Sequence, residues 1–236
     1  MLKIHKIVTP SPEQWEIIIE GMRNPMNSWD KIDSYKTHIE DPETLETADF
    51  EFFLGDNDRS LMQGLAKAGS DHRKFMRMLP VHITVTAPLY WWKEYDTYKV
   101  GTVANSCSTM HKIHAKEFLL DDFSLESVKK IVTPAVYDNL IKTLNLLREL
   151  YNDWDSLPPE IHEDWKNRGV GRKDVWKAMI ELSLSSYNQQ RTLFLNYENL
   201  MNIYFARRNH KLDEWHTFCE AIEKLPYFME IIGEDQ

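Results

Sequence analysis

A run of β-branched residues that ends in a proline constrains the possible fold more than any other part of this sequence. Residues 81–87 read Val-His-Ile-Thr-Val-Thr-Ala, a composition typical of a strand. Pro88 follows at once, and residues 89–95, Leu-Tyr-Trp-Trp-Lys-Glu-Tyr, predict a helix for which Pro88 is a suitable opening residue. Because the strand runs directly into the helix, we expect the N-terminus of the helix to lie beside the edge of a sheet.

Strands are predicted mainly in the first half of the sequence and helices in the second half. Alternating apolar and polar residues over 2–8 predict an opening strand, and residues 50–54 predict another. Between them, Ser11 and Pro12 are good first residues for a helix, which Gly21 is expected to end. Further helices are predicted over 57–69, 134–154, 159–167, 172–184, 193–208 and 212–224. This order predicts an α+β fold, with an antiparallel or mixed sheet, flanking helices and a helical C-terminal half.

The composition is that of an ordinary soluble globular protein, with 42% hydrophobic and 28% charged residues. The sequence contains no internal repeat and no dividing linker, so we predict a single domain over 1–236 with its helical part over about 124–225. The formal net charge of −9 argues against duplex nucleic acid and acidic membranes as partners. A few arginines or lysines can nevertheless hold an anionic small ligand in an acidic protein.

The cysteines and the apolar segments indicate the cellular compartment. Cys107 and Cys219 form neither a disulfide framework nor a zinc-finger spacing. No segment has the order of basic, apolar and small residues that marks a signal peptide. No apolar run approaches the roughly 20 residues that a membrane span needs. We therefore expect a cytoplasmic protein.

Two stretches carry most of the candidate ligand-binding residues. Residues 100–111 read Val-Gly-Thr-Val-Ala-Asn-Ser-Cys-Ser-Thr-Met-His, and such small polar residues favour a loop whose backbone approaches a ligand. Residues 195–202 read Leu-Asn-Tyr-Glu-Asn-Leu-Met-Asn and belong to a predicted helix. On that helix Asn196 and Arg207 share one face. An arginine at the end of a buried face needs an anionic partner, either a ligand or a neighbouring Glu or Asp.

Three stretches together resemble the flavin-dependent thymidylate synthases. Residues 9–13, Thr-Pro-Ser-Pro-Glu, resemble the first strand-to-helix turn of that family. Residues 81–111 follow the order of its signature region, whose motif reads Arg-His-Arg, two residues, Ser, one residue, Asn-Glu, one residue, Ser, one residue, Arg-Tyr. Asn105 and Ser108 correspond to the Asn and the later Ser of this motif. Residues 195–202 resemble the late helix of the family, Asn-x-Arg-Ser-Leu-Met-Asn.

The sequence departs from the family motif at most of its charged positions. The replacements in the signature region are Tyr98-Lys99-Val100 for Arg-His-Arg, Val103 for Ser, Ser106 for Glu, and Met110-His111 for Arg-Tyr. In the late helix, Glu198 stands where the family has Arg. A charge-assisted hydrogen bond contributes roughly 1.5–3 kcal/mol. The loss of several cations therefore predicts altered binding of the usual nucleotide and poor activity on it.

The resemblance implies a flavin-dependent one-carbon transferase that methylates a pyrimidine deoxynucleotide, either deoxyuridine monophosphate (dUMP) or a relative. It further implies FAD as the cofactor, NADPH and methylene-tetrahydrofolate as co-substrates, and a homotetramer with sites shared between subunits. The residues expected to bind the cofactor are Lys99, Gly101, Asn105, Asn196 and Asn202. Those expected to bind the substrate are Ser106, Cys107, Ser108, Thr109 and Arg207. We assign no catalytic side chain, because flavin carries the difficult chemistry. We assign no metal ligand, because no convincing set of ligands can be assembled.

Among the substrate residues, Arg207 is expected to anchor the phosphate, and Arg191 is a further candidate for that role. Simpler interpretations remain open. Asn105 and Ser108 can cap nearby loop backbone, and the basic patch 207–211 can be a solvated helix end. An aromatic cluster can stack on a planar ligand or pack between subunits; its members are Tyr90, Trp91, Trp92, Tyr95 and Tyr98.

Two other functions stay open beside the transferase. The first is a protein that keeps the fold and binds a nucleotide or flavin after its catalysis is altered or lost. The second is a metal-dependent nucleotide hydrolase, which Asp71-His72 superficially resembles although no further metal ligands can be assembled around it. A flavin spectrum separates the transferase from the hydrolase, and a turnover assay separates it from the binding protein.

Overall fold

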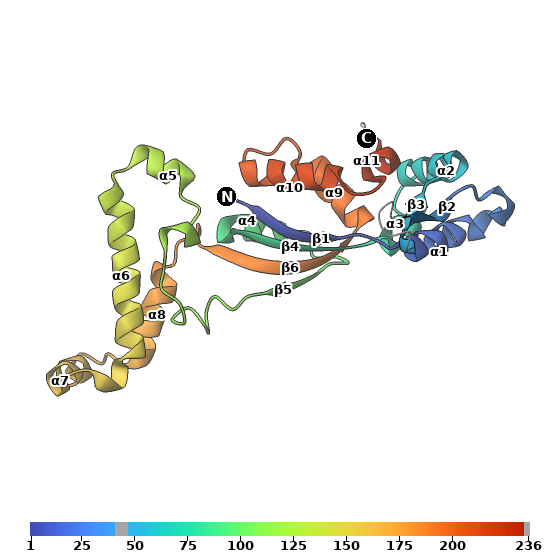
Figure 1. Ribbon diagram of the computed structural model, residues 1–236. Helices are drawn as coiled ribbons and strands as arrows, with labels where there is room; N and C mark the ends of the chain where they lie inside the picture. Colours follow the sequence, from blue (N-terminus) through green and yellow to red (C-terminus); the bar gives the residue numbers. More distant parts are fainter. Residues whose placement is uncertain (41–46, 234–236) are drawn as a thin grey trace. The chain divides into compact units, whose positions relative to one another are not determined.

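The main sheet of the protein has four antiparallel strands, described here from a computed structural model of residues 1–40 and 47–233 (Figure 1). The strand order is β1 (Lys3–Val8), β4 (Pro80–Pro88), β6 (Asn188–Asn196) and β5 (Val103–Ser106). The backbone N–H of Leu89 donates to the carbonyl of Tyr187, and that of Tyr197 donates to the carbonyl of Leu79. These two bonds fix the antiparallel register of β4 against β6, and the α+β prediction is confirmed.

The predicted junction of a strand and a helix is confirmed as β4 followed directly by α4 (Leu89–Tyr95). Val81, Ile83 and Val85 of β4 are buried and alternate with more exposed residues, as expected for a strand with one covered face. Helices α9 (Tyr197–Arg207) and α10 (Asp213–Glu223) lie over one face of the strands (Figure 1). The strand predicted over 81–87 is thus confirmed as part of β4. Its β-branched residues suit a strand because they pack well on a pleated surface.

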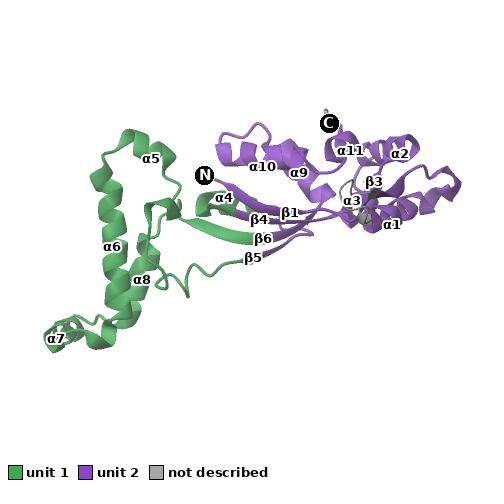
Figure 2. Cartoon of the chain, viewed as in Figure 1, with its two compact units in different colours: residues 1, 86–95, 106–191 green, residues 2–85, 96–105, 192–236 purple. Residues whose placement is uncertain are grey.

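The chain divides into two compact units, which Figure 2 shows in different colours. Unit 1 comprises residues 1, 86–95 and 106–191, and unit 2 comprises residues 2–85, 96–105 and 192–236. Strands β4 and β6 contribute residues to both units. The prediction of a single domain stays a prediction.

In unit 2, helix α1 (Pro12–Arg23) begins as predicted. The Ser11 hydroxyl accepts from the backbone N–H of Gln14 at 3.3 Å, and the Gln14 side chain accepts from the N–H of Ser11 at 2.9 Å. The prediction that Gly21 ends this helix is wrong, since α1 continues to Arg23. Its last two residues are buried, and this packing outweighs the weak helix preference of a single glycine.

A second, two-stranded sheet pairs β2 (Tyr35–Glu40) with β3 (Thr47–Phe53). Only the later of these strands was predicted, at residues 50–54. Tyr35 lies opposite Phe53 with ring centroids 5.4 Å apart, and His38 lies opposite Phe50 at 4.2 Å. Such cross-strand pairs stabilise β2, and a pattern search within one segment does not detect them. The other helices of unit 2 are α2 (Asp56–Lys67), α3 (Lys74–Met78), α11 (Phe228–Ile232) and the 3-10 turns η1 (Asn24–Met26) and η2 (Trp29–Lys31).

In unit 1, helices α6 (Pro134–Asn152) and α8 (Arg172–Leu182) pack around a core that includes the fully buried Leu144 and Met179. The predicted helices at 134–154, 159–167 and 172–184 are confirmed within two residues. The remaining elements of this unit are α5 (Glu126–Ile131), α7 (Pro159–Asn167), η3 (Leu120–Asp122) and η4 (Trp154–Ser156). In the described part of the chain, no helix is both long enough and apolar enough to span a membrane.

Three residues of the aromatic cluster after Pro88 are core residues of the chain. Trp91, Trp92 and Tyr95 are almost fully buried within this one chain. The Trp92 indole N–H donates to the Gln189 carbonyl at 2.9 Å, which satisfies its buried polar atom. These three rings are therefore not available to pack between subunits, which was one of the two roles considered for the cluster.

The predicted helix over 193–208 is wrong in its first part. Residues up to Asn196 belong to strand β6, and α9 begins only at Tyr197. Leu193 and Leu195 are buried while Thr192 is exposed, so the pattern here has the strand period of two. The helical part over 124–225 is therefore interrupted by a strand.

Candidate functional site

A polar cavity of about 340 Å³ lies in unit 2, where the loop after α4 meets the start of α9. It is lined by Ser70, Arg77, Thr97, Tyr98, Val100, Gly101, Asn196, Glu198, Asn199 and Asn202. Most of these side chains are amides or hydroxyls, and only Arg77 and Glu198 are charged. The cavity can therefore offer several hydrogen-bond donors and acceptors to a small ligand.

Two asparagines fix the start of α9 at the cavity wall. The Asn196 side-chain oxygen accepts from the backbone N–H of Asn199 at 2.9 Å, and the Asn199 side-chain oxygen accepts from the N–H of Asn196 at 3.2 Å. This reciprocal pair satisfies helix-start donors that would otherwise lack partners. The Asn199 amide also donates to the carbonyl of Val100 at 2.9 Å. The loop is thus tied to the helix that faces it.

Gly101 completes this contact in a conformation that favours glycine. Its φ of +73° lies in the left-handed region. A Cβ at this position would lie 3.6 Å from the Asn199 amide nitrogen and 3.7 Å from that of Asn196. The missing side chain therefore leaves space beside both amides.

The structure brings three of the five predicted cofactor residues to this cavity, namely Gly101, Asn196 and Asn202. Asn196 lies at the end of β6 as the N-cap of α9, not within the helix as predicted. Lys99 does not line the cavity; its side chain is 71% exposed and its ammonium nitrogen lies 3.9 Å from Asp96. Asn105 is exposed on strand β5, in a stretch that was predicted to be a loop.

Arg207 lies at the far end of α9 and does not line the cavity. Its Nε donates to the Tyr98 hydroxyl at 2.8 Å, and its guanidinium lies 4.9 Å from the centroid of the Trp215 ring. Tyr98 itself lines the cavity, so Arg207 supports one wall of it. Its assignment as the phosphate anchor stays a prediction.

The other four predicted substrate residues belong to unit 1. Ser106, Cys107 and Ser108 are exposed, and Thr109 is half-buried. The Ser108 hydroxyl accepts from the backbone N–H of His111 at 3.1 Å, which is the loop-capping geometry considered above. Arg191, the further phosphate candidate, stacks over the Trp92 ring at 4.3 Å and donates through Nε to Gln189.

Sequence reasoning missed the charged pair of the cavity. Arg77 was not considered, and Glu198 was recorded only as the replacement for a family arginine. The capping role of Asn199 had a local signal, because Asn196 and Asn199 have the spacing of a capping box. Arg77 had no comparable signal, since its partner is distant in sequence.

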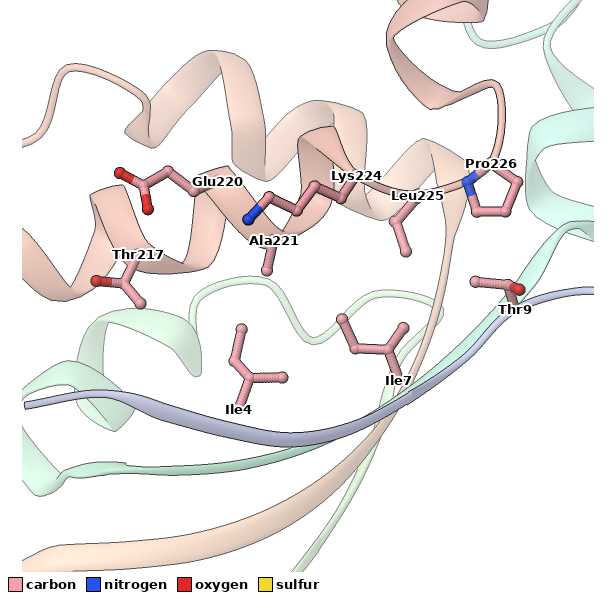
Figure 3. A pocket seen from close by; sticks show the side chains of 9 residues that line it. All are labelled: Ile4, Ile7, Thr9, Thr217, Glu220, Ala221, Lys224, Leu225 and Pro226. Carbon is pink, nitrogen blue, oxygen red and sulfur yellow. The ribbon is translucent and has the colours of Figure 1, made fainter.

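A second cavity of about 410 Å³ lies between β1 and α10 in unit 2 (Figure 3). In the close view, Ile4 and Ile7 point from β1 toward the helix, where Ala221 faces them. Glu220 and Lys224 supply its charged groups. None of the predicted ligand-binding residues is among the residues that line this cavity, and we assign no ligand to it.

The metal-hydrolase alternative gains no support from the geometry. Asp71 and His72 are both exposed. In the residues that the structure describes, no group of three or more His, Cys, Asp or Glu side chains is arranged to hold a metal ion.

Comparison with known proteins identifies the fold. No protein-family model matches the sequence, and no curated protein matches it significantly. Among solved structures, the chain is similar to thymidylate synthase X from Helicobacter pylori with FAD and dUMP, with a TM-score of 0.58 and 14% identity over 100% of this chain and 98% of that one. A second structure, a flavin-dependent thymidylate synthase of the same organism complexed with FAD and dUMP, gives a TM-score of 0.58 and 15% identity over 99% and 98% of the two chains.

The predicted flavin-dependent thymidylate synthase-like fold is therefore confirmed over the whole chain. At this level of identity the likeness shows the fold alone, because one fold supports many functions.

Proposed function

We propose that this protein is a flavin-dependent one-carbon transferase that acts on a pyrimidine deoxynucleotide, dUMP or a relative. The observation that supports it is the cavity of unit 2, which joins two of the three stretches that resemble the family. Gly101 comes from the signature region, and Asn196 and Asn202 come from the late helix. These residues are far apart in the sequence, so their convergence is a property of the folded chain.

The residues of the cavity fit part of a flavin dinucleotide or a nucleotide. Gly101 leaves space beside the two asparagine amides, and Tyr98 adds a ring beside the polar groups. A volume of about 340 Å³ lies at the lower end for small-molecule pockets. One chain would thus hold a portion of FAD, and in the homotetramer implied by the resemblance a neighbouring subunit would hold the rest. FAD would supply the one-carbon relay and the hydride, while the chain binds and orients the reactants.

Binding of FAD is the first test of this proposal. We expect titration with FAD to change flavin fluorescence and to raise the melting temperature of the protein, because a ligand that binds only the folded state stabilises it. If neither observable changes at millimolar FAD, the cofactor assignment fails. Retention of a flavin absorption spectrum on the purified protein would support it independently.

Turnover on dUMP is expected to be weak. Val100 and Met110 stand where the family has arginine, so the base and the phosphate lose hydrogen-bond donors. The measurement is tritium release from dUMP labelled at the reacting carbon, with saturating methylene-tetrahydrofolate and NADPH. Release at the rate of an ordinary family enzyme assayed in parallel would contradict this expectation.

A second candidate function has one observation in its favour. Glu198 places a carboxylate in the cavity wall at the position of a family cation. Such a change favours a protein that binds a nucleotide or flavin without the usual catalysis. FAD binding without any tritium release from dUMP or other labelled pyrimidine nucleotides would select this alternative.

A further inference from the structure

The Glu198 carboxylate lies between two arginines at the edge of the cavity in unit 2. Arg77 Nη1 lies 3.1 Å and 2.9 Å from the two Glu198 oxygens. On the other side, Arg73 Nε lies 3.8 Å from Oε1 of the same carboxylate. The side chains of Glu198 and Arg73 are 13% and 14% exposed, whereas that of Arg77 is 40% exposed. Arg77 is therefore the member of this cluster that most faces solvent and the cavity.

The cluster carries more positive than negative charge. Two guanidinium groups share one carboxylate, and in the described part of the chain no other acidic oxygen lies within 4.0 Å of either arginine. The other contact of Arg73 is to the sulfur of Met201 at 3.7 Å, which does not neutralise it. Screening by salt is weaker for partly buried charges than for exposed ones. The cluster of Arg73, Arg77 and Glu198 at the edge of the cavity thus keeps a net positive charge although it contains a glutamate.

The hydrogen bonds of Arg77 leave one edge of its guanidinium unused. All of its bonds to described residues involve Nη1, which also donates to the Ser70 carbonyl at 3.0 Å. Arginine carries five N–H donors in a rigid planar fork. Nε and Nη2 therefore remain able to donate, and the bonds at Nη1 already restrict the side chain. A restricted fork loses less conformational entropy when it binds an oxyanion.

We propose that Arg77 anchors a phosphoryl group of the ligand in this cavity and that Glu198 limits the strength of this anchor. The proposal rests on the proposed function, and it deepens it by naming the group that recognises phosphate. The phosphoryl group belongs either to a pyrimidine nucleoside monophosphate or to the pyrophosphate of FAD. Asn196, Asn202 and Thr97 then contact uncharged parts of the same ligand.

Paired ligands distinguish the two sources of phosphate. Calorimetry on the full-length protein would compare dUMP with deoxyuridine and FAD with riboflavin, and inorganic phosphate would serve as a minimal probe. Arg77→Gln should weaken binding of the phosphorylated member of one pair by at least about tenfold, because a charge-assisted bond is lost. The same variant should bind the phosphate-free member of that pair with wild-type affinity. The pair that responds identifies the source.

Glu198→Gln should change affinity for the phosphorylated ligand in the opposite direction to Arg77→Gln. The amide oxygen can still accept from Arg77 Nη1, but the negative charge beside the phosphate site is gone. Affinity for the phosphorylated ligand should rise about fivefold. A cluster with a purely structural role would instead lose stability in both variants and change phosphate binding in neither.

Arg59→Gln is the matched control. Arg59 is also an arginine of unit 2 with two carboxylate partners, Asp56 at 3.1 Å and Glu230 at 2.9 Å, and it does not line the cavity. This variant should keep wild-type affinity for every ligand.

Three outcomes overturn the proposal. One is wild-type binding of both dUMP and FAD by a folded Arg77→Gln protein, and another is an equal loss with the phosphate-free ligands. The third is a wild-type protein that binds none of dUMP, FAD and inorganic phosphate. If phosphate binds through Arg77 while FAD and turnover are absent, the anchor stands and only the transferase proposal fails.

Discussion

At the scale of single residues, Asp58 shows how a buried charge is stabilised in this fold. Its side chain is fully buried, and one oxygen lies 2.6 Å from Nε of the equally buried Arg23. The other oxygen accepts from the backbone N–H groups of Asp33 and Ser34 and from the Ser34 hydroxyl. A buried carboxylate needs this combination of an ion partner and hydrogen bonds. The cluster joins α1 and α2 to the segment before β2.

Asp58→Asn should lower the free energy of unfolding by about 3–5 kcal/mol, because it leaves the Arg23 guanidinium buried without its partner. Urea denaturation followed by circular dichroism would measure the loss. Asp56→Asn in the same helix is the control. That carboxylate is 92% exposed beside Arg59, so its removal should change stability by no more than about 0.5 kcal/mol. Equal losses in the two variants would show that the buried pair has no special role.

The two cysteines differ in exposure and therefore in reactivity. Cys107 is exposed, whereas Cys219 is buried on α10, and burial raises the pKa of Cys219 to about 12. At pH 8 a disulfide reagent should react quickly with one thiol per chain and with the second only after unfolding, because the thiolate is the nucleophile. Cys107→Ser should abolish the fast phase. Fast reaction of the remaining thiol in a folded protein would contradict the burial of Cys219.

The raised pKa of Cys219 also predicts how the stability of the folded protein changes with pH. The folded state holds the Cys219 proton more tightly than the unfolded state, whose thiol pKa is about 8.5. The stabilising contribution is therefore complete below that pH and is lost as the pH rises toward about 12.

At the scale of elements, helix α9 and the loop before β5 stabilise each other. The asparagine pair that begins α9 also holds the Val100 carbonyl, and the Tyr98 hydroxyl accepts from Arg207 at the other end of the helix. Both ends of α9 are thereby bonded to the loop. The loop in turn forms a wall of the cavity. Changes in the loop should therefore affect stability as well as ligand binding.

Gly101→Ala should lower the free energy of unfolding by about 1–2 kcal/mol, since an L-residue is strained at the φ of +73° found there. Gly64→Ala is the opposite control, because Gly64 lies within α2 with open space around it. This second change should stabilise the protein by about 0.5–1 kcal/mol through helix preference. Thermal unfolding of both variants measures the difference, and a neutral Gly101→Ala would show that the loop can relax.

At the scale of the whole molecule, the resemblance still implies a homotetramer with shared sites. Trp91, Trp92 and Tyr95 are buried within one chain and add no support, so the expectation depends on the family resemblance and on the small size of the cavity within one chain. Sedimentation equilibrium at micromolar concentration should give four times the chain mass of 28.0 kDa. A monomer under these conditions would mean that one chain must hold its whole ligand.

Much of the fold could be predicted from short sequence patterns, because the start of a helix or the end of a strand depends on residues that are adjacent in the sequence. Pro88 after a β-branched run gave the junction of β4 and α4, and Ser11 with Pro12 gave the start of α1. The predicted helix over 134–154 is observed as α6, and its Leu144 lies in the core of unit 1. The same kind of signal failed at residues 193–196, where a strand passes directly into a helix and both carry leucines.

Amino-acid order alone thus determined the α+β class and the junction at Pro88. The family resemblance named Asn196 and Asn202, and the structure places both at the cavity. Only the tertiary structure decided that β2 is a strand, that Trp91 and Trp92 are core residues, and that Glu198 lies beside Arg77. The physical reason is that a side chain's partner sets its role, and these partners come from distant segments. The sequence recorded Glu198 as a lost cation, whereas in the fold its carboxylate lies beside two arginines, Arg73 and Arg77.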